Sequence, residues 1–174
     1  MRIEMKILVT YSSKTGNTKK LAEGIYEGLG EMEKKILPMS EVKSLDAYDT
    51  VLAGYWVDKG GANEEAAAFL KEISGKKVGV FATLAFWPDS DHGVGAIKAG
   101  EELVKEKNHV IGRYICQGKI DPRMIEIFEK MPKDNPHYPT PEKRKRHRIS
   151  ANHPSAADIA CAAELFRERI EEDV

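Results

Sequence analysis

The sequence predicts a single α/β domain in which helices cover both faces of a parallel β-sheet. Short apolar runs alternate along the chain with segments of helical periodicity, which is the pattern of βαβ units. Strands joined by helical crossovers of this length lie parallel to one another. The chain has 174 residues, of which 41% are hydrophobic and 32% charged, so one domain with a buried core is expected.

Five apolar runs are predicted to form the strands. The first, MKILVTY at residues 5–11, is continuously apolar, as a strand covered on both faces should be. The other four predicted strands are residues 34–39, 48–57, 78–85 and 109–117.

Helical periodicity follows four of these strands. The first helix is predicted at residues 18–29, where Leu21, Ala22, Ile25 and Leu29 form one apolar stripe. The other main helices are expected at 63–73, at 93–107 and from Pro154 to beyond Ile170. The last of these begins at Ser155 and Asp158, which resemble a capping box with Asp in place of Glu.

Residues 119–154 interrupt the alternation. This segment is rich in proline, contains the run KRKRHR at 143–148, and has nine Lys and Arg against five Asp and Glu. Within it only residues 122–130 have a helical pattern. We therefore expect one domain over residues 1–174 with an irregular, basic, Pro-rich insertion on its surface. This charge pattern does not indicate a general nucleic-acid-binding surface.

The cysteine content and the amino-terminal sequence favour a cytoplasmic protein. Cys116 and Cys161 lie far apart without CxxC spacing, which argues against a disulfide framework or a zinc site. The amino-terminal apolar run carries an acidic residue and is too short to cross a bilayer, so neither a signal peptide nor a membrane span is expected.

The sequence YSSKTGNT at residues 11–18 follows the first strand and opens the first helix, and it is predicted to bind phosphate. A helix N-terminus offers unpaired N–H groups and a partial positive charge. Hydroxyls of Ser13, Thr15 and Thr18 can add donors, and Gly16 lets the backbone approach an anion closely. Neither the P-loop pattern nor the dinucleotide GxGxxG pattern is present. The alternative is an ordinary strand-to-helix turn with good capping residues.

Ser13–Thr18 matches S-x-T-G-N-T and resembles the FMN-phosphate loop of flavodoxins. Residues 83–92, TLAFWPDSDH, resemble the T-x4-P-D-S-x-H loop of a flavodoxin-like subfamily that includes proteins encoded beside bile-pigment reductases. The resemblance covers most of residues 5–118 and the final helix. It implies a three-layer sandwich, a five-stranded parallel sheet in the order 2-1-3-4-5, and non-covalent FMN at the carboxyl ends of the strands.

The resemblance also implies which residues contact the cofactor, and these lie in three loops. The phosphate loop supplies Ser12, Ser13, Lys14, Thr15, Gly16, Asn17 and Thr18. The loop after the third strand supplies Tyr55, Trp56, Val57, Asp58 and Gly60. The loop after the fourth strand supplies Thr83, Leu84, Ala85, Phe86, Trp87, Asp89 and His92.

Aromatic side chains in the last two loops are candidates for stacking on the flavin ring, and both tryptophans of the chain are among them. The alternatives are that Trp56 ends a buried strand and that Trp87 packs against the insertion. His92 is expected to cap the following helix or to support the site, and Cys116 is expected to be a buried apolar residue. No residue is assigned a catalytic role.

Two functions follow from the resemblance. The first is an electron carrier that passes electrons between redox partner proteins, a reductase and an acceptor enzyme. The second is an FMN-dependent NAD(P)H oxidoreductase acting on a quinone- or tetrapyrrole-like acceptor. Apart from these two, a regulatory or assembly module that binds FMN or has lost it is a further alternative. The basic run is either a solvated surface or a docking site for an acidic partner or for nicotinamide phosphates.

Overall fold

The computed structural model describes residues 6–172 and contains a parallel sheet of five strands. These are β1 (Ile7–Tyr11), β2 (Lys34–Pro38), β3 (Thr50–Asp58), β5 (Lys77–Leu84) and β6 (His109–Gln117). Their order is β2-β1-β3-β5-β6, and every pairing is parallel, which confirms the predicted order. Met5, which the first predicted strand included, lies outside the described residues.

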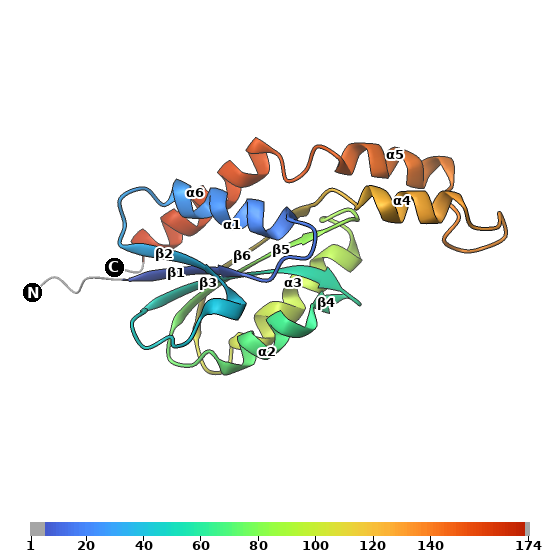
Figure 1. Ribbon diagram of the computed structural model, residues 1–174. Helices are drawn as coiled ribbons and strands as arrows, with labels where there is room; N and C mark the ends of the chain where they lie inside the picture. The colour runs from blue at the N-terminus through green and yellow to red at the C-terminus, as the bar shows by residue number, and fades with distance from the viewer. Residues whose placement is uncertain (1–5, 173–174) are drawn as a thin grey trace, which may run out of the picture.

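Helices cover both faces of the sheet, as predicted (Figure 1). The helices α1 (Asn17–Gly28) and α6 (Ala156–Glu172) lie on one face, and α2 (Glu64–Glu72) and α3 (Asp91–Val104) lie on the other. A short 3-10 helix, η1 (Met39–Glu41), follows β2. Each interface has its own apolar core, one containing Phe81 and Phe166 and the other containing Tyr55 and Leu70. The result is a three-layer sandwich. Loops lie at the edge of the sheet that is formed by the carboxyl ends of the strands.

The end of β3 is extended by a short hairpin that the sequence analysis did not predict. The two-residue strand β4 (Gly61–Ala62) pairs antiparallel with β3, with Asp58 opposite Gly61. The connecting residues Lys59 and Gly60 have φ of 51° and 79°. Positive φ at both central residues is typical of the type I′ turn, whose twist matches that of the paired strands. The turn at residues 58–61 is therefore held in one conformation by strand pairing.

The insertion confirms the helix predicted at residues 122–130 and adds a second helix where the sequence predicted none. It forms α4 (Pro122–Glu129) and α5 (Pro141–Ser150), and α5 contains the whole basic run. Thr140 caps α5 by accepting a hydrogen bond from the Lys143 N–H, and Pro141 occupies the first turn, where its missing N–H costs nothing. Figure 1 shows this pair of helices extending beyond the sheet.

The start of α6 agrees with the sequence. The Ser155 hydroxyl accepts from the Asp158 N–H at 3.1 Å, and an Asp158 carboxylate oxygen accepts from the Ser155 N–H at 2.8 Å. This reciprocal pair is the predicted capping box. Cys116 is buried in the core as predicted, and burial raises the pKa of its thiol. Within residues 6–172, no helix has both the length and the apolar character needed to cross a membrane.

Candidate functional site

Buried hydrogen bonds tie the predicted phosphate loop to its neighbours at the carboxyl ends of the strands. The hydroxyls of Thr18, on α1, and Thr83, on β5, lie 2.9 Å apart and are both buried. The Asn63 side-chain amide, at the start of α2, donates to the Ser12 hydroxyl at 2.8 Å. These side chains therefore fix the loop in place, and their hydroxyls are engaged within the protein.

The exposed part of the loop is suited to an anion. Gly16 has φ of 100° and is the N-cap residue of α1, and it has no side chain with which to cap the helix. The Ser13 hydroxyl accepts from the N–H groups of Gly16 and Lys19, each at 3.2 Å, which leaves the hydroxyl proton free to be donated outward. Lys14 and Thr15 are also exposed. Of the hydroxyls in this loop, those of Ser13 and Thr15 are therefore placed to bind a ligand.

A pocket of about 260 Å³ runs from the phosphate loop to the ends of β3 and β5. Four groups of residues line it. Lys14, Thr15 and Asn17 come from the phosphate loop, Trp56 and Val57 from β3, and Thr83, Leu84 and Ala85 from β5 and its loop. The remaining wall consists of Lys119, Ile120, Asp121 and Met124, which lie at the root of the insertion and on α4. The pocket thus joins a polar, cationic end to an apolar slot.

These residues fit a ligand that carries a phosphate and a flat ring. The loop end offers the open N-terminus of α1, the space around Gly16 and the Lys14 ammonium.

The structure separates the aromatic candidates. Tyr55 is fully buried under α3, its hydroxyl donates to the Ala96 carbonyl at 2.8 Å, and it is not among the residues that line this pocket. Trp56 is half-buried and lines the pocket, with the Lys14 ammonium 5.2 Å from its ring centroid. Trp87 is 38% exposed and is not among the residues that line this pocket. Side chains of neighbouring strand residues point to opposite faces of the sheet. For this reason Tyr55 is buried under α3 whereas Trp56 lines the pocket.

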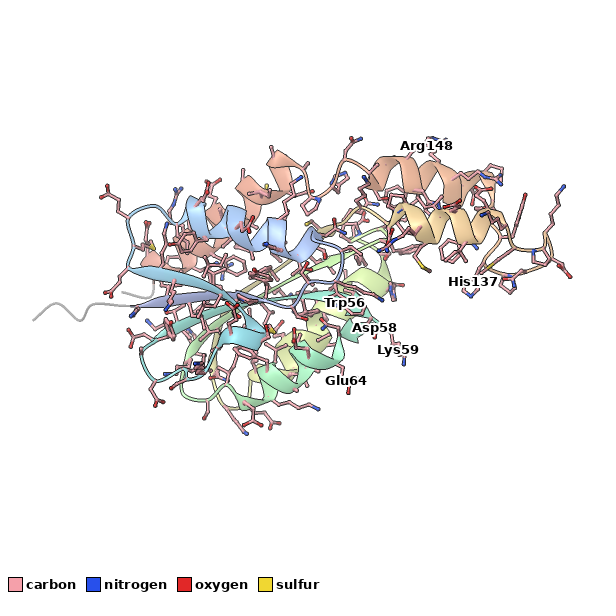
Figure 2. All side chains as sticks on the ribbon, in the orientation of Figure 1. Trp56, Asp58, Lys59, Glu64, His137 and Arg148 are labelled. Carbon is pink, nitrogen blue, oxygen red and sulfur yellow. The ribbon has the colours of Figure 1, made fainter. Side chains whose placement is uncertain are left out.

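The polar candidates lie at the rim of the site. Figure 2 shows Trp56, Asp58 and Lys59 together at the end of β3, where Lys59 is exposed. Asp89 and His92 are also exposed. The helix cap expected of His92 is provided instead by Ser90, whose hydroxyl accepts from the Gly93 N–H at 3.1 Å. His92 lies edge-on to Phe86, with ring centroids 5.9 Å apart.

The loop after Gln117 also reaches the site, although none of its residues was predicted to lie there. The structure connects this loop to the phosphate loop through Asn17, whose side chain donates to the Lys119 carbonyl at 2.8 Å and accepts from the Lys119 N–H at 3.2 Å. Asp121 caps α4, and its hydrogen bonds from Arg123 hold its pKa below the usual range. The Asp121–Pro122 pair is a helix-start signal. It fixes the start of the helix predicted at residues 122–130 directly after the loop that reaches the site.

A parallel α/β sandwich with a phosphate loop and an apolar slot at its carboxyl edge defines the class of flavodoxin-like proteins. A family model described as a flavodoxin domain matches residues 8–167. The chain therefore belongs to the flavodoxin-domain family.

Curated relatives and solved structures agree with this assignment. The flavodoxin-like domain-containing protein BilS of Clostridioides difficile (strain CD3) is 36% identical over 162 residues, which cover 89% of this chain and 90% of that protein. The crystal structure of oxidised flavodoxin 2 from Bacillus cereus has a TM-score of 0.62 and 22% identity, and the match covers 97% of this chain and 99% of that one. At this identity the solved structure shows a shared fold.

A further solved structure carries the expected cofactor. Fusobacterium nucleatum flavodoxin, solved with bound flavin mononucleotide, has a TM-score of 0.50 and 19% identity, and the match covers 67% of this chain and 72% of that one. FMN is also the cofactor expected from the phosphate-loop sequence of this chain.

Proposed function

We propose that this protein binds FMN at the carboxyl edge of its sheet and exchanges electrons with a partner protein that docks at the same edge. The observation that carries the proposal is the single pocket that joins Lys14 and Thr15 of the phosphate loop to Trp56, Leu84 and Ala85. A phosphate-bearing ligand with a flat apolar ring matches both ends of this pocket.

Each part of the site has a distinct task. Ser13, Thr15 and the backbone around Gly16 would hold the phosphate, while Trp56 and Leu84 would enclose the ring and exclude water. Bound FMN supplies the redox chemistry, and the protein orients the cofactor and sets the charge around it. Lys14 provides a positive charge over the Trp56 ring.

The surface around the pocket supports a docking role. Four large hydrophobic side chains are exposed among residues 6–172, namely Trp87, Val94, Met124 and Ile127. All of them lie on the connection from β5 to α3, on α3 itself or on α4, which are elements that flank the pocket. On α5, Lys145 and Arg148 are exposed. An apolar centre suits protein docking, and the two cations of α5 favour an acidic face on the part of the partner that meets α5, whereas the exposed carboxylates Asp89, Asp91 and Glu126 lie nearer the centre.

The cofactor part is tested by titrating the protein with FMN. Replacing Thr15 with Ala removes one exposed hydroxyl from the phosphate loop and should weaken FMN binding about tenfold, the effect of losing one hydrogen bond to a charged group. The matched control is Ser74→Ala, because Ser74 is exposed in the connection from α2 to β5, at the opposite edge of the sheet. Equal FMN affinities for wild type and Thr15→Ala would contradict the assignment of the phosphate loop.

The docking part is tested with small redox probes of opposite charge. The reduced flavoprotein should react with ferricyanide at a rate that falls as salt is added, and with hexaamminecobalt(III) at a rate that rises. The reverse salt dependence would contradict an acidic partner. Rapid bleaching of the flavin by NADH or NADPH alone would instead favour the oxidoreductase alternative.

A further inference from the structure

A second pocket, of about 280 Å³, lies between the β5–α3 connection and the helices of the insertion. It shares Val57, Leu84, Ala85 and Ile120 with the first pocket, so the two are neighbours. Its remaining lining differs in character from that of the first pocket. Six side chains give it an aromatic and cationic character: Phe86, His92, Phe128, His137, Arg146 and His147. Figure 2 shows His137 beyond the sheet, at the outer part of the insertion.

Arg146, on α5, supplies a positive charge with an unused donor. Its guanidinium carbon lies 4.6 Å from the centroid of the Phe86 ring, in a cation–π arrangement. Its Nε atom is buried and has no hydrogen-bond partner among the described residues. Burial also lowers the pKa of Arg146. A buried guanidinium N–H without an acceptor is costly, and an anion in the pocket would satisfy it.

His147 and Phe128 form a flat wall beside this charge. The Phe128 ring stacks on His137 at 5.8 Å between centroids and on His147 at 6.5 Å, with interplanar angles of 14° and 27°. His147 is 8% exposed, and its Nδ1 atom has no partner among the described residues. Stacked rings of this kind provide an apolar face for another flat ring.

The charges around the pocket are of one sign. Lys143 also lines it, whereas none of the described residues that line it is acidic. The nearby Glu129 carboxylate accepts two hydrogen bonds from Arg144, both at 2.8 Å, and is engaged there. The potential inside the pocket therefore favours anions over cations.

We infer that this second pocket binds a small planar anion, namely a carboxylate or phosphate attached to one or two fused aromatic rings. The ring would occupy the part of the pocket that Phe86 and Phe128 line, and the anionic group would accept from Arg146. This site goes beyond the proposed FMN function, because Phe128, Arg146 and His147 lie on the insertion, outside the three loops to which the resemblance assigns the cofactor. It shares Phe86 and His92 with those loops, and its binding does not require flavin chemistry.

The test is a calorimetric titration of the FMN-loaded protein with 2-naphthoate and with its neutral analogue 2-naphthamide. Naphthoate should bind, and naphthamide should bind at least about tenfold more weakly, because it lacks the charge that Arg146 would recognise. Equal affinity of the two probes, or no binding of naphthoate at millimolar concentration, would overturn the inference.

Two variants on the same helix sharpen the test. Arg146→Gln should weaken naphthoate binding at least about tenfold, whereas Lys145→Gln, which removes an equal charge from an exposed position one residue away, should leave it within about twofold. Circular dichroism of both variants checks that α5 remains folded. Unchanged naphthoate affinity in a folded Arg146→Gln protein would overturn the assignment of the anion to Arg146.

Because the two pockets adjoin, the titration is repeated without added FMN. Naphthoate should bind with similar affinity in both states, so a failure of the FMN proposal would leave this result intact. Competition between naphthoate and FMN for one site would show instead that the second pocket is part of the flavin site, and it would overturn the inference.

Discussion

The Lys14 ammonium lies 5.2 Å from the centroid of the Trp56 ring, so a charge from the phosphate loop covers an aromatic side chain from β3. Such cation–π contacts contribute about 0.5–1 kcal/mol at exposed sites. The contact joins two segments that are far apart in sequence and places the charge at the pocket. A flat ligand at Trp56 therefore meets a positive charge.

Replacing Lys14 with Met should lower the reduction potential of bound FMN. A nearby positive charge stabilises the negative charge that reduction adds, so its loss makes reduction less favourable. We expect a decrease of about 30 mV, which corresponds to about 1.4 kcal/mol for a two-electron couple. Dye-equilibration titration measures this potential. Lys71→Met, at an exposed position on α2, is the control, and equal potentials for both variants would contradict the prediction.

Replacing Gly16 with Ala should lower the free energy of unfolding by about 1–2 kcal/mol, because residue 16 has φ of 100° and a side chain disfavours that conformation. No atom lies within 4 Å of the position that a Cβ would take, so the cost is conformational and not steric. Gly95→Ala in α3 has the same free space and no positive φ, and should instead stabilise the protein by about 0.5–1 kcal/mol. Denaturant unfolding of both variants makes the comparison.

Replacing Tyr55 with Phe should destabilise the fold by about 1 kcal/mol without changing FMN affinity. The substitution removes the buried hydrogen bond from the Tyr55 hydroxyl to the Ala96 carbonyl and keeps the ring in place. Chemical denaturation and FMN titration of the same sample provide both readouts. A large loss of FMN affinity would show instead that the Tyr55 hydroxyl contributes to FMN binding.

Replacing Asp158 with Asn should lower stability at neutral pH by about 1 kcal/mol. Burial alone would raise the pKa of Asp158, but the hydrogen bonds from the Ser155 N–H and from His153 outweigh it and hold the pKa below its ordinary value. Because the folded pKa is depressed, the carboxylate stabilises the fold above its unfolded pKa of about 3.9, and this contribution is lost as the pH falls below that value.

The unfolding curves of wild type and Asp158→Asn should therefore converge as the pH falls below about 4. The exposed Asp134, replaced with Asn, serves as the matched control and should follow wild type throughout. A stability difference between wild type and Asp158→Asn that stays constant down to pH 2 would contradict the role assigned to the carboxylate.

The strands and their order were predictable because continuous apolar runs and a recognisable phosphate loop are local signals. The helix α5 was not, because its basic run has no apolar stripe and depends on the Thr140 cap and on the ion pair between Arg144 and Glu129, which are 15 positions apart. The alternation of strand side chains predicts that Tyr55 and Trp56 face opposite ways, but only the packing of α3 decides which one is buried. The insertion residues that line the pocket could not be predicted either, because contacts between residues far apart in the sequence place them there.

The paired hydrogen bonds between Asn17 and the Lys119 backbone make the phosphate loop and the root of the insertion one mechanical unit. Gly118 reinforces the join, because a Cβ at that position would lie 2.7 Å from the Asn17 side-chain nitrogen. The phosphate loop and the segment that leads into α4 are therefore held together by the same side chain. A truncated protein that lacks the insertion from Lys119 onward would lose the partner of the Asn17 side chain, so removal of the insertion would also alter the phosphate loop.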